Sequence, residues 1–338
     1  MINKDFIFNM KKNVRCIVTR GKLQESEHLI HCLVINENEK IIFKSGNINT
    51  PYCLRSTLKP FQCAASLHLK TDEKFKFTNK EVAITCASHH GEIKHIKTIK
   101  SILHKLNLNA SDLECGFHFP LNKKNKTRLY ANKLKKTNIY NNCSGKHAGL
   151  LALIINMGLN TKNYIDHKHP IHKYINDYIQ NHANQKANCF STDGCSLPTP
   201  FYSLRVLAKL YMKLMVSEKK SILYKVKTSM MQYPEMISGK KGFDTFFMNQ
   251  FPYKAISKGG AEGMQALALH TKKYGNISLA LKVSDGNHRG NYISCIKILK
   301  YIDAINQNDE KSLLNFINEK QTNLNNIEIG NLICEISN

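Results

Sequence analysis

Hydrophobic residues near the start of the chain occur in short runs separated by polar turns. Three such runs, rich in β-branched residues, cover 16–19, 28–35 and 40–43. Their length and composition predict an antiparallel meander of three strands. After residue 55 the apolar positions recur at spacings of three and four, which is the periodicity of a helix. Because Pro60 is tolerated only near a helix start, we expect this helix to begin close to Ser56.

The same reading divides the rest of the chain into a helical middle and a strand-containing end. Helical periodicity dominates from about residue 95 to 232, and later elements are expected as strands at 254–257 and 277–283 and helices near 289–303 and 310–319. We therefore predict an α+β fold, with one mixed β-sheet backed by helices and a helical subdomain. The predicted arrangement is a single domain over 14–338, with a sheet part at about 14–94 and 250–338 and a helical part at about 95–249.

The net charge of the chain adds little to this prediction. The formal charge of +24 would favour contact with nucleic acid, yet only six of the 49 basic residues are arginine. Arginine supplies the bidentate contacts that base and phosphate recognition favours. We therefore expect weak attraction to polyanions but no specific nucleic-acid partner.

The distribution of apolar residues also bears on location. No run of eighteen or more uncharged apolar residues occurs, so a membrane-spanning helix is not expected. Near the start, Asp5 lies beside a very short apolar patch that precedes two lysines, which is the wrong order for a secretory signal. A cytoplasmic location is expected.

The eleven cysteines are odd in number, scattered and without a CxxC pair, which argues against a disulfide framework. Most are expected to be reduced core residues. Cys143 and Cys195 differ, because each lies in a polar turn with a glycine close by.

Ser56 and Lys59 are three residues apart at the predicted helix start, so their side chains share one face. Such a lysine can activate the serine only if its pKa falls from about 10.4 toward 7–8, a shift worth roughly 4 kcal/mol. The helix N-terminus and Arg55 would supply part of the positive potential needed. The alternative is a capping serine beside a solvated lysine.

Four polar turns offer further candidate groups, at 141–147, 191–195, 257–263 and 283–289. Such turns on a rigid scaffold often hold ligands or catalytic groups, although each one could equally be a hairpin or a helix cap. His89, His90 and His95 raise metal binding as an alternative, but no H-E-x-x-H spacing is present.

Taken together, these clusters resemble the L-asparaginase II family, the bacterial asparaginases typified by the inducible Rhizobium enzyme. The resemblance runs from Arg20-Gly21 to Arg289, and its most specific parts are 142–149 and 193–195. It implies a fold like that of the serine β-lactamases and glutaminases. Ser196 and Tyr140 depart from the family pattern, which prefers glycine and histidine at these positions.

The resemblance also implies roles for individual residues. Ser56 with Lys59 would form one serine–lysine pair, and Ser88 with Lys258 a second. A zinc site would be formed by three residues, with water completing the coordination and Asp193 close by; these residues are Cys143, Lys146 and Cys195. The serine chemistry itself would not require the metal.

We therefore expect an amidohydrolase that converts L-asparagine to L-aspartate and ammonia through an activated serine. Arg55 is the expected partner of the substrate carboxylate, with Asp193 and Glu262 as further substrate-binding residues. A homodimer is expected. The alternatives are a related serine amidohydrolase acting on glutamine or another small amide, and a non-catalytic protein that binds zinc or an amino acid.

Overall fold

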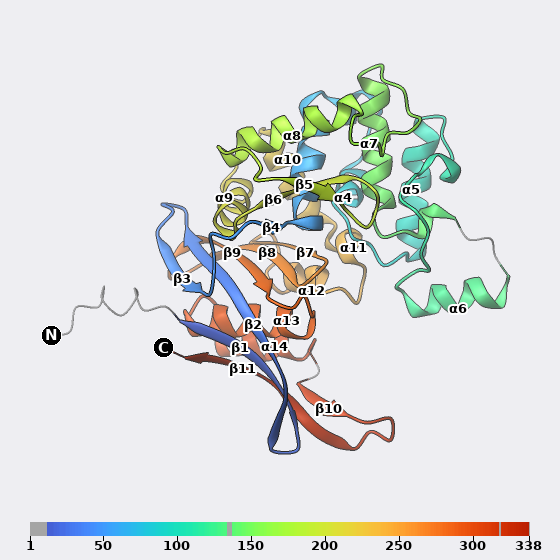
Figure 1. Cartoon of the computed structure of the whole chain (residues 1–338). Helices are drawn as coiled ribbons and strands as arrows, with labels where there is room; N and C mark the ends of the chain where they lie inside the picture. Colours follow the sequence, from blue (N-terminus) through green and yellow to red (C-terminus); the bar gives the residue numbers. More distant parts are fainter. Residues whose placement is uncertain (1–11, 134–136, 318, 338) are drawn as a thin grey trace. The chain divides into compact units, whose positions relative to one another are not determined.

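The computed structural model describes residues 12–133, 137–317 and 319–337. The N-terminal stretch with Asp5, which bears on the expected cytoplasmic location, lies outside the described residues. The chain forms two compact units (Figure 1). The sheet unit contains the residues up to Tyr52, Tyr202–Val216 and the residues from Gln250 onward, and the helical unit contains Cys53–Phe201 and Ser217–Asn249.

An eight-stranded sheet forms the core of the sheet unit, in the order β10-β11-β1-β2-β9-β8-β7, with β3 paired to β2 (Figure 1). Its strands are β1 (Asn13–Arg20), β2 (Leu23–Asn36), β3 (Ile41–Ser45), β7 (Ala255–Gly260), β8 (Met264–Thr271), β9 (Gly275–Val283), β10 (Lys320–Thr322) and β11 (Glu328–Ser337). The N-terminal meander predicted from the apolar runs is confirmed, since β1 pairs with β2 and β2 with β3.

All the ladders of this sheet within the described residues are antiparallel, whereas a mixed sheet was expected. The reason lies in the connections. β7, β8 and β9 follow one another through short turns, as do β1 and β2, and a short turn can join only antiparallel neighbours. The α+β class itself is confirmed.

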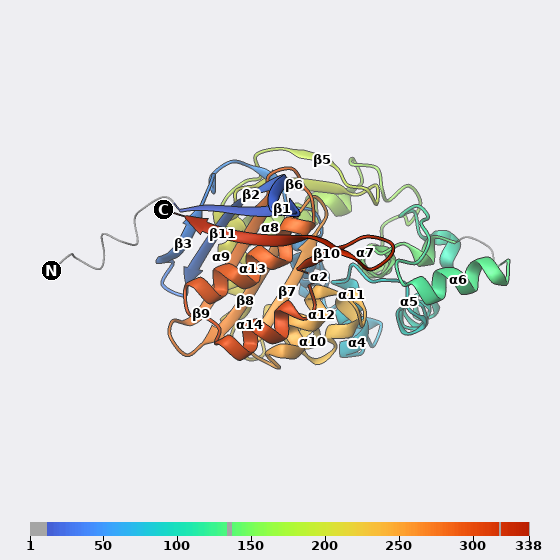
Figure 2. The ribbon, with the colours of Figure 1, turned by 90° about the horizontal axis from the view of Figure 1, so that it is seen from below.

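Helices cover both faces of this sheet. On one face lies α9 (Leu204–Met215), where Ser278 Oγ donates a hydrogen bond to Ala208 O at 2.7 Å. Side chains alternate along a strand, so residues next to Ser278 face the other side. There α13 (Arg289–Tyr301) packs on β1, β2, β9 and β11, with α14 (Gln307–Leu314) against α13 (Figure 2).

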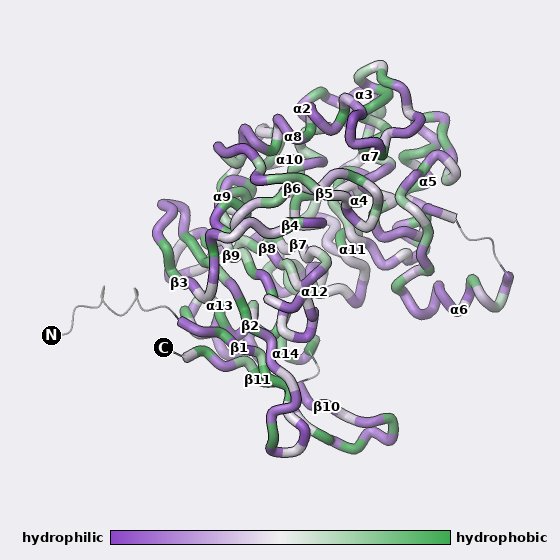
Figure 3. Tube along the Cα trace, viewed as in Figure 1, coloured by the Kyte–Doolittle hydropathy of each residue, from purple (hydrophilic) through white to green (hydrophobic). Residues whose placement is uncertain are grey.

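The helical unit is built around α7 (Ser144–Asn156), a helix that is buried over most of its length. Its other α-helices are α2 (Lys59–His68), α3 (Thr71–Lys74), α4 (Asn79–Thr85), α5 (Ile93–Lys105), α6 (Lys123–Ala131), α8 (Pro170–Ala183), α10 (Ile222–Gln232), α11 (Pro234–Ser238) and α12 (Phe243–Gln250). A small sheet has the strand order β4-β6-β5, and its strands are β4 (Tyr52–Cys53), β5 (Phe190–Thr192) and β6 (Pro198–Tyr202). By contrast with α7, α6 is largely hydrophilic (Figure 3).

Glycine allows α7 to approach α4 closely. A Cβ on Gly145 would clash with the backbone oxygen of Ile84, and one on Gly149 would lie 2.7 Å from Thr85 Cγ2. Only glycine leaves room for this contact. The close packing fixes the start of α7 beside the residues that follow α4.

The boundaries of the two units differ from those predicted. Residues 53–94, expected in the sheet part, belong to the helical unit, because α2 and α4 pack against α7. Tyr202–Val216, expected in the helical part, belongs to the sheet unit, because α9 packs on β9. Within the described ranges, no helix is both long and apolar enough to cross a membrane.

Candidate active site

Lys59 lies at the centre of the candidate site. A short 3-10 turn (Arg55–Leu58) leads into α2, whose first turn accepts Pro60 because no intrahelical donor is needed there. The Lys59 side chain is only 1% exposed. Its Nζ donates to three acceptors: Ala87 O at 2.5 Å, Ser88 Oγ at 3.0 Å and Cys143 Sγ at 3.2 Å. These three acceptors match the three N–H donors of a lysine side chain.

Ser88 lies in the loop that follows α4, and backbone hydrogen bonds hold that loop on two sides. The Ser88 N–H donates to Ile237 O at 2.9 Å, and the His89 N–H donates to Asn142 O at 3.2 Å. The Ser88 loop therefore lies against the turn that carries Cys143. A half-buried hydroxyl beside a buried lysine is suited to proton exchange.

Ser56 occupies the 3-10 turn and is half-buried. Its hydroxyl makes no hydrogen bond to Lys59 in the described part of the chain, where the Lys59 amine contacts Ser88 instead. Arg55, directly before Ser56, has a φ of 52°. A non-glycine residue in this left-handed region is strained, and such strain is common at functional sites.

Arg55 and Asp193 form an ion pair, with Arg55 Nε donating to Asp193 Oδ1 at 2.5 Å. The two residues are far apart in sequence, so the fold brings the two predicted substrate-binding groups together. Asp193 Oδ1 also accepts the Gly194 N–H at 2.8 Å, which fixes the start of the 193–196 turn. Ser196 in this turn has a φ of 72°, the region that glycine favours, which gives a physical reason for a glycine at this position in relatives.

Lys146, on the first turn of α7, extends to the same 193–196 turn. Its Nζ donates to Cys195 Sγ at 3.0 Å, and both side chains are buried. Cys143, three residues before Lys146, is buried as well, and both thiols act on the charge of Lys146. The three residues expected to bind zinc therefore form one buried cluster, which Lys59 also contacts through Cys143.

Within this cluster the pKa values of the two thiols are shifted in opposite directions. The interaction with Cys195, together with burial, raises the pKa of Cys143. The interaction with Cys143 lowers the pKa of Cys195 strongly, against the effect of burial, and the Lys146 cation acts in the same lowering direction. Burial alone would lower the pKa of Lys146, but the Cys195 and Cys143 sulfurs and Asp193 raise it. Both shifts favour a charge-assisted contact between Cys195 and Lys146.

This donor set fits zinc. Two thiols and one amine gather in a buried cluster, and soft sulfur ligands suit this metal. Asp193 Oδ2 lies 3.8 Å from Cys195 Sγ. In the described ranges no group of three or more His, Cys, Asp or Glu side chains could hold a metal ion, so a site here would need Lys146 as its third ligand. Lys146 would have to release a proton to coordinate it.

His147 lies next to the same cluster, although no role was predicted for it from the sequence. Tyr164 Oη accepts the Glu114 N–H at 2.8 Å and lies 2.7 Å from His147 Nδ1. The other ring nitrogen of His147, Nε2, is buried without a hydrogen-bond partner, and His147 helps to lower the pKa of Cys195. His147 directly follows Lys146, which was a usable signal, whereas nothing in the sequence indicated Tyr164.

His89, His90 and His95 were considered as an alternative metal site, but His89 and His95 make hydrogen bonds within the protein. His89 Nε2 lies 2.9 Å from Ser144 Oγ, and its Nδ1 accepts the Gly91 N–H. Both ring nitrogens of His95 are also engaged, with the Glu92 N–H and Glu235 O. These rings hold loops in place and have no lone pair directed at a metal.

Lys258 and Glu262 lie in the sheet unit, on β7 and in the β7–β8 turn. Lys258 is fully buried and donates to Gly259 O. Glu262 has a φ of 59° and its carboxylate packs against Gly286, where a side chain would clash. The pairing of Lys258 with Ser88 remains a prediction.

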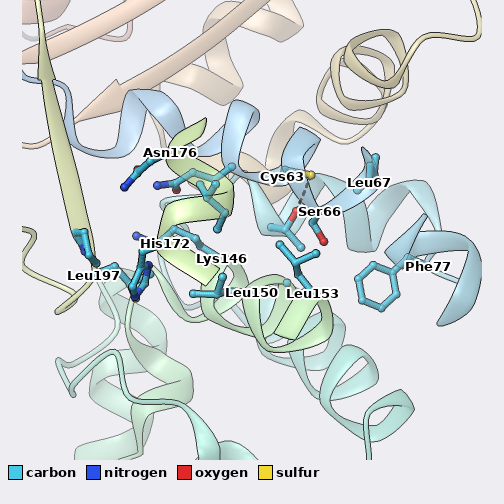
Figure 4. Close-up of a pocket in the computed structure, with 15 residues that line it drawn as sticks. Cys63, Ser66, Leu67, Phe77, Lys146, Leu150, Leu153, His172, Asn176 and Leu197 are labelled. Carbon is cyan, nitrogen blue, oxygen red and sulfur yellow. Dashed lines mark hydrogen bonds between the residues drawn. The ribbon is translucent and has the colours of Figure 1, made fainter. Parts of the chain in front are cut away.

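A small apolar cavity of about 40 Å3 adjoins Lys146 inside the helical unit. Lys146 and His172 lie at one end of it, and Leu67 and Phe77 at the other (Figure 4). This volume holds a few water molecules and is too small for an amino acid. The cavity is therefore not the substrate site.

Solved structures similar to the chain include two β-lactamases and a DD-transpeptidase. A class A β-lactamase from Bacteroides cellulosilyticus is 14% identical over 87% of this chain and 93% of its own, with a TM-score of 0.41. A β-lactamase from Francisella tularensis is 12% identical over 76% and 84%, with a TM-score of 0.36. A variant of the Streptomyces K15 DD-transpeptidase is 14% identical over 81% and 97%, with a TM-score of 0.38.

Comparison with known protein families assigns the chain to one of them. Among curated proteins, none matches the chain. The profile of the L-asparaginase II family, however, matches residues 16–334, nearly the whole length. This range includes Lys59, Ser88 and the Cys143–Lys146–Cys195 cluster described above. The chain belongs to the L-asparaginase II family.

Proposed function

We propose that this protein hydrolyses the side-chain amide of L-asparagine to L-aspartate and ammonia through an activated serine. The observation that carries the proposal is the buried Lys59 amine, 3.0 Å from Ser88 Oγ and three residues after Ser56. A lysine in this position can take up and return a serine proton once its amine is neutral. Membership of the asparaginase family supports the choice of asparagine.

In the proposed reaction, Ser56 Oγ attacks the amide carbon and its proton passes to Lys59, with Ser88 as relay. The C–N bond then breaks, the nitrogen takes a proton from the lysine, and ammonia leaves an acyl-enzyme ester. Water attacks this ester, and aspartate leaves as the serine regains its proton. The Lys59–Ser88 contact favours one alternative, in which Ser88 itself is acylated.

Arg55 and Asp193 are the proposed partners of the charged end of the substrate. The guanidinium has five donors, and the ion pair with Asp193 uses its Nε at 2.5 Å. A substrate carboxylate would bind to the guanidinium, and Asp193 would bind the α-ammonium group. Glu262 is retained as a further proposed substrate-binding residue.

Zinc would be held by Cys143, Lys146 and Cys195, and when bound it would supply a Lewis acid and a fixed positive charge. The residues of the chain act without it in the proposed steps. With the metal absent, Lys146 holds Cys195 in place and keeps the 193–196 turn, and hence Asp193, in position.

Ammonia release from asparagine and from glutamine, measured with and without zinc, tests the proposal. Release from asparagine at a higher kcat/KM than from glutamine is the expected result. Preference for glutamine would instead indicate the related amidohydrolase. Binding of either amino acid without ammonia release would indicate a binding protein. The proposed homodimer is tested separately by light scattering of the purified chain.

A further inference from the structure

A hollow on the surface of the helical unit lies between α5 and α6, which are neighbours in Figures 1 and 2. It has a volume of about 240 Å3 and is lined by Ile93, Ile96, Lys97, Lys100, Asn125, Arg128, Leu129 and Tyr140. Three of these side chains are cationic, four are apolar or aromatic, and none carries a carboxylate. This α5–α6 hollow shares no lining residue with the candidate active site.

Each of the two helices contributes both apolar and basic groups to the α5–α6 hollow. The four lining residues of α5 are related by spacings of three and four, so they share one face of the helix. On α6 the same spacings relate Asn125 to Arg128 and Leu129. Ile93 is 49% exposed, so a large apolar side chain lies at the surface close to the cations. The hollow therefore combines a hydrocarbon floor with a cationic rim.

The cations of the rim have no counter-charge. Lys97, Lys100 and Arg128 are exposed, and none of them forms an ion pair or a side-chain hydrogen bond with any residue that the structure describes. By contrast, Lys297, which lines a larger hollow of the sheet unit, pairs with Glu310 at 3.0 Å. A hollow lined by charges of one sign concentrates ions of the opposite sign. The α5–α6 hollow is therefore suited to an anion supplied by the solution.

We propose that the α5–α6 hollow binds a small alkyl carboxylate, with the carboxylate on the cationic rim and the hydrocarbon chain on the apolar floor. The planar guanidinium of Arg128 matches a carboxylate, and Lys97 and Lys100 add positive charge. Burial of the chain against Ile93 and Ile96 supplies apolar contact. A volume of 240 Å3 equals that of about eight water molecules in the liquid, which limits the ligand to roughly ten non-hydrogen atoms.

Other classes of ligand satisfy only part of this arrangement. A neutral apolar molecule would leave the three cations without a partner, and an inorganic anion would leave Ile93 exposed. A nucleic-acid strand is the main competitor, because its phosphates would also bind the cations. It would gain little from the isoleucine side chains, since bases stack on aromatic rings. The combination of floor and rim therefore favours an anion with a hydrocarbon chain.

The test is calorimetric titration of the full-length protein with octanoate at low salt, in parallel with octanamide and acetate. Octanamide keeps the hydrocarbon chain and lacks the charge, whereas acetate keeps the charge and lacks the chain. Octanoate should bind near one equivalent, about tenfold more tightly than either comparison ligand. Equal binding of octanamide, or equal binding of acetate, would overturn the proposal. This comparison is made on the wild type and is independent of whether asparagine is hydrolysed.

Substitutions at exposed side chains locate the bound anion. The double change Lys100→Gln with Arg128→Gln removes two charges at similar length and should weaken octanoate binding by about tenfold. Ile93→Asn should weaken it by about threefold through loss of apolar contact. Lys186→Gln is the matched control, because Lys186 is an exposed lysine of the same unit, and it should bind octanoate as the wild type does.

Two results with these variants would contradict the proposed site. Unchanged octanoate binding by the double variant would place the anion elsewhere on the protein. A single-stranded oligonucleotide that displaces octanoate, and that binds the Ile93→Asn variant as tightly as the wild type, would assign the cations to nucleic acid instead. Circular dichroism of each variant confirms that the folded protein is the species being titrated.

Discussion

Replacing Lys59 by methionine is the sharpest perturbation of the candidate site. Methionine keeps an unbranched apolar side chain of similar length and removes only the amine. The change deletes three hydrogen bonds at once, to Ala87 O, Ser88 Oγ and Cys143 Sγ. The proposal therefore predicts loss of turnover with a folded protein.

The expected magnitudes can be worked from these contacts. Removing a general base typically costs a factor of about 10² to 10⁴ in rate, or roughly 3–5 kcal/mol of transition-state stabilisation. Leaving the buried Ala87 carbonyl without its donor costs about 1–3 kcal/mol of folding free energy. This is less than the roughly 5–15 kcal/mol by which native domains are stable. Activity should therefore fall far more than stability.

The assay is steady-state ammonia release from asparagine, with the unfolding midpoint measured on the same preparation. Lys186→Met is a matched control, because Lys186 is an exposed lysine of the same unit. The control should keep wild-type kcat/KM. A folded Lys59→Met variant that also kept it would refute the role of Lys59 as the base.

Four further outcomes are expected. Ser56→Ala and Ser88→Ala should each lower kcat by roughly a hundredfold or more. Mass spectrometry of the enzyme quenched during turnover should find the acyl group on Ser56. An acyl group on Ser88 would reverse the proposed roles of the two serines. Zinc should bind the wild type near one equivalent, and Cys143→Ala should abolish this binding; metal analysis of the reconstituted proteins checks it. Burial lowers the pKa of His95 from 6.5 to about 4. The unfolded chain therefore binds a proton in this window that the folded chain does not, so stability is lost as pH falls from 6.5 toward 4. The free energy of unfolding in urea should drop by roughly 2 kcal/mol from pH 7 to pH 5 through His95 alone, and His95→Gln should remove this part of the slope. Gly145→Ala should destabilise the protein by about 1–3 kcal/mol through overpacking against α4, which a thermal melt would show; an unchanged melt would contradict the close approach.

The elements predicted best are those whose apolar pattern is local. The strands β1 to β3 and the helix starting near Ser56 were recognised because side-chain period and a proline signal both lie within a few residues. β8 was missed. Its sequence, MQALALHT, is rich in alanine and leucine, which favour helix, and it is a strand because β7 and β9 pair with it on both sides.

β11 shows a different limit. Its partner β1 lies at the opposite end of the chain, with Cys16 facing Cys334. Nothing near residues 328–337 indicates that a strand edge is available to them. Pairing over such a separation depends on the whole fold and cannot be inferred from local periodicity.

The candidate site shows the same difference between local patterns, which could be predicted, and contacts between distant residues, which could not. The spacing of Ser56 and Lys59 suggested a pair on one helical face, but the fold places the Lys59 amine against Ser88, a residue 29 positions away. The contact of Lys146 with Cys195 spans 49 positions. Motifs therefore picked out residues that the fold gathers, while the contact partner of each was set by how α2, α4 and α7 pack.

Two of the buried lysines, Lys59 and Lys146, differ in their requirements from most of the 49 basic residues of the chain. Lys59 and Lys146 are 1% and 7% exposed, and burying a cation is costly unless it has partners, which both have in serine or cysteine side chains. An arginine in either place would stay charged, so it could neither accept the proton of a serine nor bind a metal through a neutral nitrogen. At these two positions lysine is the residue that the proposed reaction and the proposed ligand set require, whereas the exposed lysines carry no such requirement.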